Sequence, residues 1–214
     1  MDEELVDLKR LYGKIKDHIC QRIEDFEAVK SGDDDERYFE EMAFCLFTPQ
    51  SKAKSCWDAV EELKENELLE KGIAEDISKV INQVRFRNRK AVYFVEARDK
   101  FGSGGGNIKN KIMEMEDVKD TRGWLVDNVK GLGYKEASHY LRNIGLGKNI
   151  AILDRHILRN LERYNVIEEV PTNLTPSKYV EIEEKMKAFS ERVNIPLHHL
   201  DLLLWYKETG EIFK

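Results

Sequence analysis

Hydrophobic positions recur every three or four residues along almost the whole chain, which is the spacing of one face of an α-helix. The first such face is formed by Leu5, Leu8, Leu11, Tyr12, Ile15 and Ile19. The polar run from Ser31 to Asp35 interrupts it, and a second apolar face begins after Glu36. No segment alternates apolar and polar residues as a half-buried strand does. The pattern therefore predicts an all-α fold.

Proline, glycine and capping residues mark where one predicted helix ends and the next begins. Pro49 ends the second helix, and Ser51 is expected to cap the third. Further helices are predicted over 67–71, 73–84, 87–100, 107–115, 117–129, a segment after Gly133, 154–164, 177–193 and 196–208. The glycine-rich run from Gly102 to Asn107 lacks the Lys-Ser/Thr of a phosphate-binding loop, so we expect a linker turn there.

The 214 residues suffice for one large domain or two small ones, and 41% hydrophobic with 36% charged residues is typical of a globular protein. No apolar run is long enough to span a membrane and the first ten residues are charged, so we expect an intracellular protein without a membrane segment. Cys20, Cys45 and Cys56 show no CxxC spacing, so we expect buried thiols and no disulfide or metal site.

Charge is distributed unevenly along the chain. The formal net charge is −6, yet the stretch from Arg85 to Lys148 holds 14 Lys and Arg against 8 Asp and Glu. A basic region inside an acidic chain is consistent with a nucleic-acid partner. A solvated face of ion pairs explains the same counts, because a count does not say where side chains point.

The most informative segment runs from Val129 to His139, where one predicted helix ends in Gly131-Leu132-Gly133 and another starts at once. Backbone N–H groups at such a turn and at the first turn of a helix lack partners and suit a phosphate. Glycine allows both the tight turn and the close approach of a DNA backbone. Phosphate contacts of this kind hold DNA without reading its sequence. Glycine that merely turns the chain between two helices is the alternative.

This segment resembles the helix-hairpin-helix of the DNA glycosylase superfamily, here at about 117–143. Lys135 stands at the superfamily's nucleophile position, and Asp154, nineteen residues later, matches its catalytic aspartate. The sequence from Gly131 to His139, followed by Leu141-Arg142-Asn143, is similar to the compact second type of 8-oxoguanine DNA glycosylase of archaea and some thermophilic bacteria. The resemblance extends to Thr48-Pro49-Gln50-Ser51 and to the segment from Trp205 to Lys214.

The resemblance implies a fold of two helical subdomains with the active site in the cleft between them. Residues 1–35 plus 136–214 are expected to form the terminal subdomain and 36–135 the central one. The implied activity is that of a bifunctional glycosylase and AP lyase that excises 8-oxoguanine from duplex DNA, acting as a monomer. Superfamily members with an iron–sulfur cluster need four cysteines near the C-terminus, and this chain has three, none of them there. We expect no metal or other cofactor beyond, at most, a monovalent cation at the hairpin.

The chemistry of base excision explains why a lysine and an aspartate are paired. Positive charge builds on the sugar as the bond from C1′ to the base stretches, and a carboxylate such as Asp154 stabilises it. An amine must be uncharged to attack C1′, so we expect Lys135 in a partly dry pocket. The resulting imine makes the C2′ proton acidic, and β-elimination then cuts the strand. Asp154 is also expected to cap the helix that it begins.

The resemblance also implies how the lesion is held once it leaves the base stack. Trp205 is expected to stack on the damaged base, Asp201 to hydrogen-bond it, and the α-carboxylate of Lys214 to reach its edge. Core packing is the alternative for Trp205, and a frayed tail is the alternative for Lys214. Gln50 resembles a residue that other superfamily members place near the lesion; a solvated turn is the alternative.

Phe86, flanked by Arg85 and Arg87, is expected to fill the gap left by the flipped base or to contact the opposite base, unless it is a core residue. His139 and His156 are expected to support other residues or contact phosphate rather than act as general bases. Two other functions stay open at this point. One is a glycosylase of the same fold that removes another lesion, such as an oxidised pyrimidine. The other is a non-catalytic DNA-binding module, in which Lys135 is only a cation.

Overall fold

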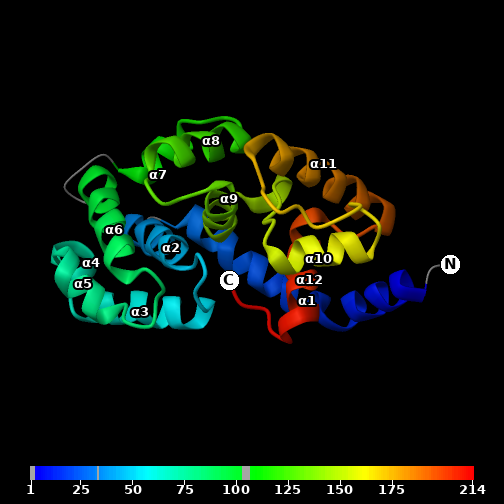
Figure 1. Ribbon diagram of the computed structural model, residues 1–214, viewed down its shortest axis with the longest axis horizontal. Helices are drawn as coiled ribbons and strands as arrows, with labels where there is room; N and C mark the ends of the chain where they lie inside the picture. Colours follow the sequence, from blue (N-terminus) through cyan, green and yellow to red (C-terminus); the bar gives the residue numbers. More distant parts are fainter. Residues whose placement is uncertain (1–2, 33, 103–106) are drawn as a thin grey trace.

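The computed structural model describes residues 3–32, 34–102 and 107–214, and within these ranges it contains helices and no strands (Figure 1). The all-α prediction is therefore confirmed. The helices are α1 (Glu3–Ser31), α2 (Asp35–Phe47), α3 (Ala53–Glu65), α4 (Leu68–Lys71), α5 (Ala74–Val80), α6 (Arg87–Phe101), α7 (Ile108–Met113), α8 (Val118–Asn128), α9 (Tyr134–Asn143), the 3-10 helix η1 (Gly147–Asn149), α10 (Arg155–Arg163), α11 (Pro176–Val193) and α12 (Leu197–Thr209). The predicted linker turn and the centre of the first break fall on 103–106 and 33, outside the described residues.

Several helix starts follow directly from the sequence. The side chains of Asp34, Asp117, Asp154 and Thr175 each accept a hydrogen bond from a backbone N–H in the first turn of α2, α8, α10 and α11. The predicted Ser51 cap is wrong, because the residue before α3 is Lys52 and its side chain makes no capping bond. The Ser51 hydroxyl instead accepts from the backbone N–H of Arg85 at 2.9 Å.

Two smaller predictions were also wrong. Helix α5 ends at Val80 rather than at Val84, although Ile81 and Val84 stay buried. The spacing of apolar residues continues through the turns that follow α5, so it extends beyond the end of the helix. Cys20 is only partly buried, whereas Cys45 and Cys56 are buried as expected.

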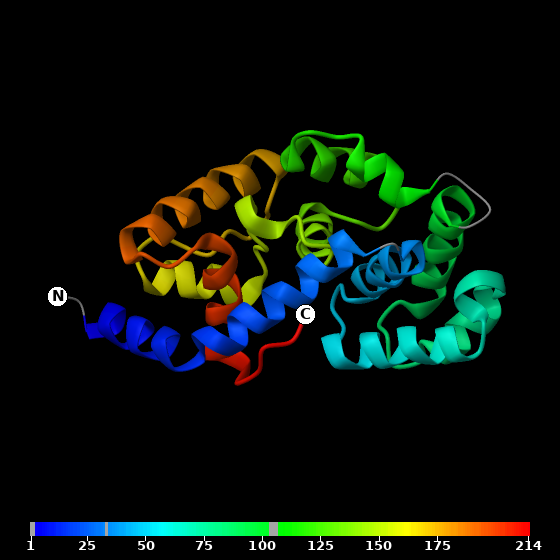
Figure 2. The same cartoon turned by 180° about the vertical axis from the view of Figure 1, so that it is seen from behind.

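Two clusters of buried residues form the core. The first contains residues from Tyr38 to Ile150, and the second combines α1 with the segment from Ala151 to Leu204. Helix α9 lies between the two halves of the molecule (Figure 1), and α1 runs across both when they are seen from behind (Figure 2). The buried apolar side chains of α9 belong to the first cluster, although the predicted boundary at 135/136 assigns them to the terminal subdomain. That division of the chain stays a prediction.

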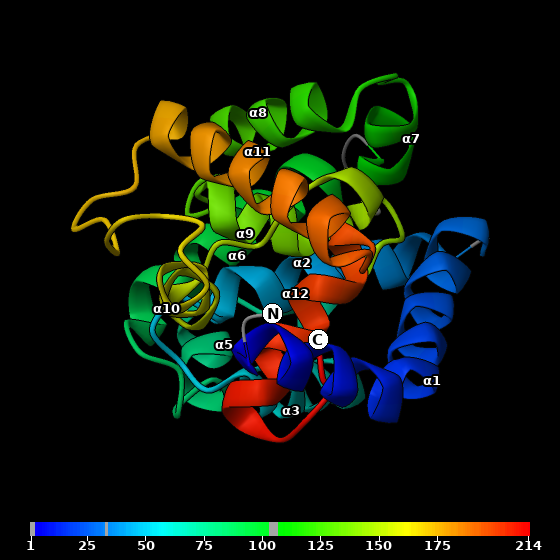
Figure 3. The ribbon, with the colours of Figure 1, turned by 90° about the vertical axis from the view of Figure 1, so that its right-hand side faces the viewer.

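The other helices and the end of the chain pack around this core. Helices α8 and α11 lie along one face of the molecule (Figure 3). After α12 the chain returns to the middle of the molecule, where it ends beside α9 (Figures 1 and 2). None of the helices within the described ranges has both the length and the apolar character that crossing a bilayer requires.

Candidate active site

A cleft of about 630 Å³ lies between the two clusters. One wall is formed by the loop between α2 and α3 and by α9, and the other by residues 152–159 and α12. Six predicted site residues line it, and they are Gln50, Lys135, Asp154, Asp201, Trp205 and Lys214. Folding thus gathers residues that are far apart in the sequence into one concave site, which is the usual form of a ligand-binding site.

Lys135 occupies the first turn of α9, directly after the glycine turn. Its side chain is 26% exposed, and its Nζ lies 3.2 Å from Oε1 of Glu136. Lys135 is therefore partly shielded from solvent and lines the cleft. The partly dry pocket that nucleophilic attack requires stays a prediction.

Asp154 is the N-cap of α10, as predicted, and its Oδ1 accepts from the backbone N–H of Ile157 at 2.8 Å. The backbone at Asp154 is extended, with φ −88° and ψ −179°, so the carboxyl group stands at the mouth of the helix. The capping bond engages one carboxylate oxygen and orients the group toward the cleft that it lines. One residue can thus begin a helix and present a charge.

The two glycines of the hairpin differ in what they require. Gly131 has φ +97°, and a Cβ there would lie 2.5 Å from Cδ2 of Tyr93. Gly133 has an ordinary φ of −94°, and a Cβ there would meet only the flexible end of Glu136 at 3.1 Å. Both glycines are exposed, so a phosphate can approach them. Gly131 is needed for the turn itself, and Gly133 leaves space outside it.

Gly131→Ala is expected to lower the free energy of unfolding by about 1–3 kcal/mol, because alanine is strained at this φ and clashes with Tyr93. Gly133→Ala is expected to keep its stability and lose affinity for DNA, because the new methyl group only obstructs the approach of a phosphate. Thermal unfolding and DNA binding of the two variants check this contrast. Equal stability of both variants would contradict it.

Trp205 and Asp201 lie one helical turn apart on α12. The Trp205 ring packs edge-on against His156 with centroids 5.2 Å apart, and the residue is only partly buried. Oδ2 of the buried Asp201 accepts from the Arg142 guanidinium at 2.6 Å. Burial raises the pKa of Asp201 to about 6, against the opposing effect of Arg142.

Lys214 is anchored by its side chain rather than frayed. Its Nζ donates to Glu41 and lies 3.4 Å from the centroid of the Trp57 ring. Burial lowers the pKa of this ammonium group to about 8, although Glu41 opposes the shift. Glu41 also accepts from Asn143 at 2.9 Å. This anchoring fixes the last residue at the edge of the cleft.

A lysine that was not predicted as a site residue supports the loop between α2 and α3 from behind the cleft wall. Lys90 is 6% exposed, and its Nζ donates to the carbonyl oxygens of Phe47 and Pro49 at 2.7 and 2.6 Å. Burial lowers its pKa to about 8. The amine thereby holds the loop that carries Gln50, whose φ is +56°. Within a basic stretch, nothing in the sequence distinguishes a buried lysine from an exposed one.

Arg85, Phe86 and Arg87 are exposed and are not among the residues that line the cleft. Phe86 is 53% exposed with φ +60°, so the core alternative for it is wrong. The bond from the Arg85 N–H to Ser51 places this loop beside the cleft rim. An exposed aromatic ring at a rim is suited to contact with a ligand that extends beyond the cleft.

The two histidines have different surroundings. His139 is buried against the Phe44 ring, and burial together with Arg142 and Lys135 holds its pKa well below the usual range. A ring with so low a pKa is a weak base, which makes it poorly suited to general-base catalysis. Both histidines line the cleft, and His156 does so beside Trp205. Among the described residues, no group of three or more His, Cys, Asp and Glu side chains is arranged to hold a metal ion.

Comparison with known proteins identifies the family. The family model described as 8-oxoguanine DNA glycosylase matches residues 19–195. The chain belongs to the 8-oxoguanine DNA glycosylase family.

Members of this family match the chain along its whole length. The 8-oxoguanine DNA glycosylase/AP lyase of Fusobacterium nucleatum is 45% identical over 100% of this chain and 99% of its own. That of Korarchaeum cryptofilum is 38% identical over the same shares of the two chains. A crystal structure of Methanocaldococcus jannaschii 8-oxoguanine glycosylase/lyase with 15mer DNA containing 8-oxoguanine superposes with a TM-score of 0.90 at 35% identity, over 99% of this chain and 100% of that one.

In this member of the 8-oxoguanine DNA glycosylase family, α8, the glycine turn and α9 form the helix-hairpin-helix. Arg155 and Arg159 also line the cleft from exposed positions on α10, and the sequence analysis did not single them out as site residues. Their spacing of four residues, directly after Asp154, places them on one helix face and was the available signal.

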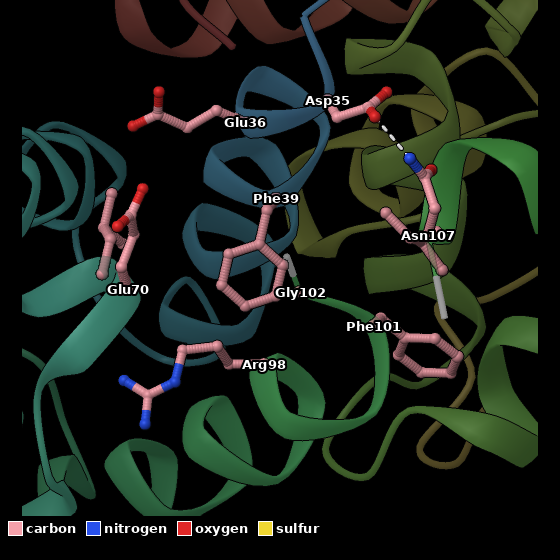
Figure 4. Close-up of a pocket in the computed structure, with 10 residues that line it drawn as sticks. Asp35, Glu36, Phe39, Glu70, Arg98, Phe101, Gly102 and Asn107 are labelled. Atoms are coloured by element: carbon pink, nitrogen blue, oxygen red, sulfur yellow. Dashed lines mark hydrogen bonds between the residues drawn. The ribbon is translucent and has the colours of Figure 1, made fainter. Parts of the chain in front are cut away.

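A second cavity of about 320 Å³ lies between α2 and α6 (Figure 4). Phe39 and Phe101 line it together with Glu36, Glu70 and Arg98. The Arg98 guanidinium is already engaged, since it donates to the carbonyl oxygen of Gly72 at 2.6 Å. None of the predicted site residues is among those that line this cavity.

Proposed function

We propose that the chain excises 8-oxoguanine from duplex DNA and then cleaves the strand, with Lys135 as nucleophile and Asp154 as the stabilising carboxylate. One observation carries the proposal: the two residues come from opposite walls of one cleft, which Trp205 also lines. The printed activity of the relatives, 8-oxoguanine DNA glycosylase/AP lyase, supports it. The complex of a structural neighbour with DNA containing 8-oxoguanine supports duplex DNA as the partner.

The proposed reaction has two stages. The uncharged Lys135 amine attacks C1′, the bond from C1′ to the base breaks, and the departing base takes up a proton. Asp154 stabilises the positive charge on the sugar and accepts a proton from the attacking nitrogen. The nitrogen lone pair then expels O4′, which takes up a proton, so that the sugar ring opens and an imine forms at C1′. The imine allows the C2′ proton to leave, and the bond from C3′ to oxygen breaks with phosphate as leaving group.

Recognition of the lesion is assigned to two residues of α12 and to Lys214. 8-Oxoguanine differs from guanine by an N7–H donor and a C8 oxygen, so an acceptor facing N7–H selects the lesion. We assign stacking to Trp205 and hydrogen bonding to Asp201 and the main chain of Lys214, because all three line the cleft.

The duplex outside the flipped base needs contacts of its own. We assign the phosphate contacts to the exposed backbone at Gly131 and Gly133. Gln50, which lines the cleft, and the loop Arg85–Phe86–Arg87 beside its rim are assigned to the opposite base or to the gap left in the stack. A flipped base leaves such a gap, and an exposed aromatic ring can fill it.

Borohydride trapping tests the proposal. The protein is incubated with matched duplexes that contain 8-oxoguanine, guanine or an oxidised pyrimidine at one position, in the presence of borohydride. A covalent complex is expected with the 8-oxoguanine duplex, because borohydride reduces the imine irreversibly. Preferential trapping on the oxidised pyrimidine would favour the alternative lesion. Binding without trapping on any duplex would reduce the protein to a DNA-binding module.

Discrimination between 8-oxoguanine and guanine is expected to weaken as pH falls from 7 to 5, because a protonated Asp201, with a pKa of about 6, is a poorer acceptor. Unfolding does not explain this loss. An acid whose pKa is raised by folding stabilises the folded state below its unfolded pKa, and this contribution is lost as pH rises through about 6. Excision of both bases across this range, with unfolding monitored in parallel, checks the prediction. If the ratio of 8-oxoguanine to guanine excision stays constant from pH 7 to 5, Asp201 does not take part in recognition of the lesion.

A further inference from the structure

The backbone that leads into Asp154 is held by side chains rather than by a helix. Ile150 is extended, with φ −125° and ψ 155°, so the next residues lack helical hydrogen bonds. Glu183 of α11 accepts from the Ala151 N–H at 2.8 Å. The Tyr179 hydroxyl, also on α11, donates to the Ala151 carbonyl at 2.7 Å and accepts from the Leu153 N–H at 3.1 Å. Two side chains therefore fix the segment immediately before Asp154.

The same side chains are connected to the helix that carries Lys135. Arg122 of α8 donates to both carboxylate oxygens of Glu183, at 2.6 and 2.9 Å. It also donates to the hydroxyl of Ser138 at 3.2 Å. Ser138 lies one turn after Lys135 on α9, and its hydroxyl oxygen is 3.2 Å from that of Tyr179. The connection thus spans α8, α9, α11 and the segment before Asp154.

The ion pair at the centre of this connection, between Arg122 and Glu183, is buried. The side chains of Arg122 and Glu183 are each 1% exposed. The guanidinium also lies beside the rings of Tyr134 and Tyr179, 5.1 Å from each centroid. A buried ion pair rarely stabilises a protein more than apolar side chains of similar size would. The geometry that it imposes is the better explanation for its presence.

We propose that Arg122, Tyr179 and Glu183 are positioning residues, which together set the separation between the Lys135 amine and the Asp154 carboxylate. The inference rests on the proposed function of those two groups. The three residues are not among those that line the cleft, so they act through the backbone and not on DNA. A displacement of about 1 Å at reacting groups lowers a rate by about 10²-fold, so loosening this connection slows imine formation without weakening DNA binding.

Tyr179→Phe is the sharpest test, because it removes only the hydroxyl that bonds Ala151, Leu153 and Ser138. The amide of Leu153 is expected to exchange its hydrogen faster. The single-turnover rate of borohydride trapping is expected to fall by about 10- to 100-fold, with DNA affinity unchanged. Glu183→Gln, which keeps the shape of the side chain, is a second variant and is expected to speed exchange at Ala151.

Phe189→Leu is the matched control on the same helix. Phe189 is buried against the Tyr164 ring, with centroids 5.5 Å apart, so its replacement lowers stability without touching these hydrogen bonds. Its trapping rate is expected to stay that of the unmodified protein. A similar fall in the control variant would show general destabilisation and overturn the positioning role.

The two measurements separate failure of the inference from failure of the proposed function. Faster exchange at Leu153 with an unchanged trapping rate would overturn positioning. Unchanged hydrogen exchange at Leu153 and Ala151 in the two variants would show that these side chains do not hold the segment before Asp154. If the unmodified protein forms no imine on any duplex, the proposed function is contradicted. Hydrogen exchange would still show whether Tyr179 and Glu183 hold the segment before Asp154.

Discussion

Lys135→Gln is expected to abolish borohydride trapping and strand cleavage while leaving most of the DNA affinity intact. Glutamine keeps a polar side chain of similar length in the first turn of α9, and its amide nitrogen is not a nucleophile. Losing a nucleophile commonly lowers a rate by on the order of 10³-fold or more. Gel analysis of the covalent complex and of the cut strand, with binding measured on uncut DNA, checks this result.

Lys130→Gln is the control for a general loss of positive charge at the hairpin. Lys130 lies on the same turn, but its amine pairs with Glu96 at 3.1 Å and its side chain is 58% exposed. We expect weaker DNA binding and normal trapping at saturating DNA. Equal losses of trapping in the two variants would show that Lys135 acts only as a cation.

Asp154→Asn is expected to separate the two roles of this residue. Asparagine caps helices about as well as aspartate, so the free energy of unfolding is expected to change by less than about 1 kcal/mol. The charge that stabilises the sugar is lost, and excision is expected to fall by about 10²- to 10⁴-fold. Single-turnover excision and denaturant unfolding of the same preparation check both parts.

Asp117→Asn provides the matched change at another helix start. Asp117 caps α8 through the N–H groups of Lys119 and Asp120, and it is not among the residues that line the cleft. We expect this variant to excise the lesion at the normal rate. An Asp154→Asn variant that keeps full activity would leave that aspartate with a structural role only.

Local features of the sequence predicted most of the local structure, apart from the cap of α3 and the end of α5. Apolar residues spaced by three and four identified the helices, and Asp154 was recognised as a cap because the rule for helix starts involves only neighbouring residues. The glycine turn before Lys135 was also predicted from neighbouring residues alone. The structure agrees, because Gly131 has φ +97°, which few other residues adopt. The spacing of Lys135 and Asp154, together with the resemblance, was sufficient to nominate the pair.

Contacts between distant parts of the chain could not be predicted in this way. Lys90 reaches the carbonyl oxygens of Phe47 and Pro49, and Lys214 reaches Glu41. From the sequence pattern alone, each of these charged side chains is expected to be exposed. A charge can be buried only where other groups pair with it, and those groups come close only when the helices pack.

The sequence by itself thus determined the helices, most of their starts and the glycine turn, because each depends on residues close together in the chain. The two proposed reacting groups were nominated by their spacing and by the family resemblance. Only the tertiary structure decided which polar groups are buried, and therefore how Asp201 meets Arg142 and how α11 holds the backbone before Asp154. These arrangements depend on several helices packing at once, and helical periodicity identifies a buried face without specifying what lies against it.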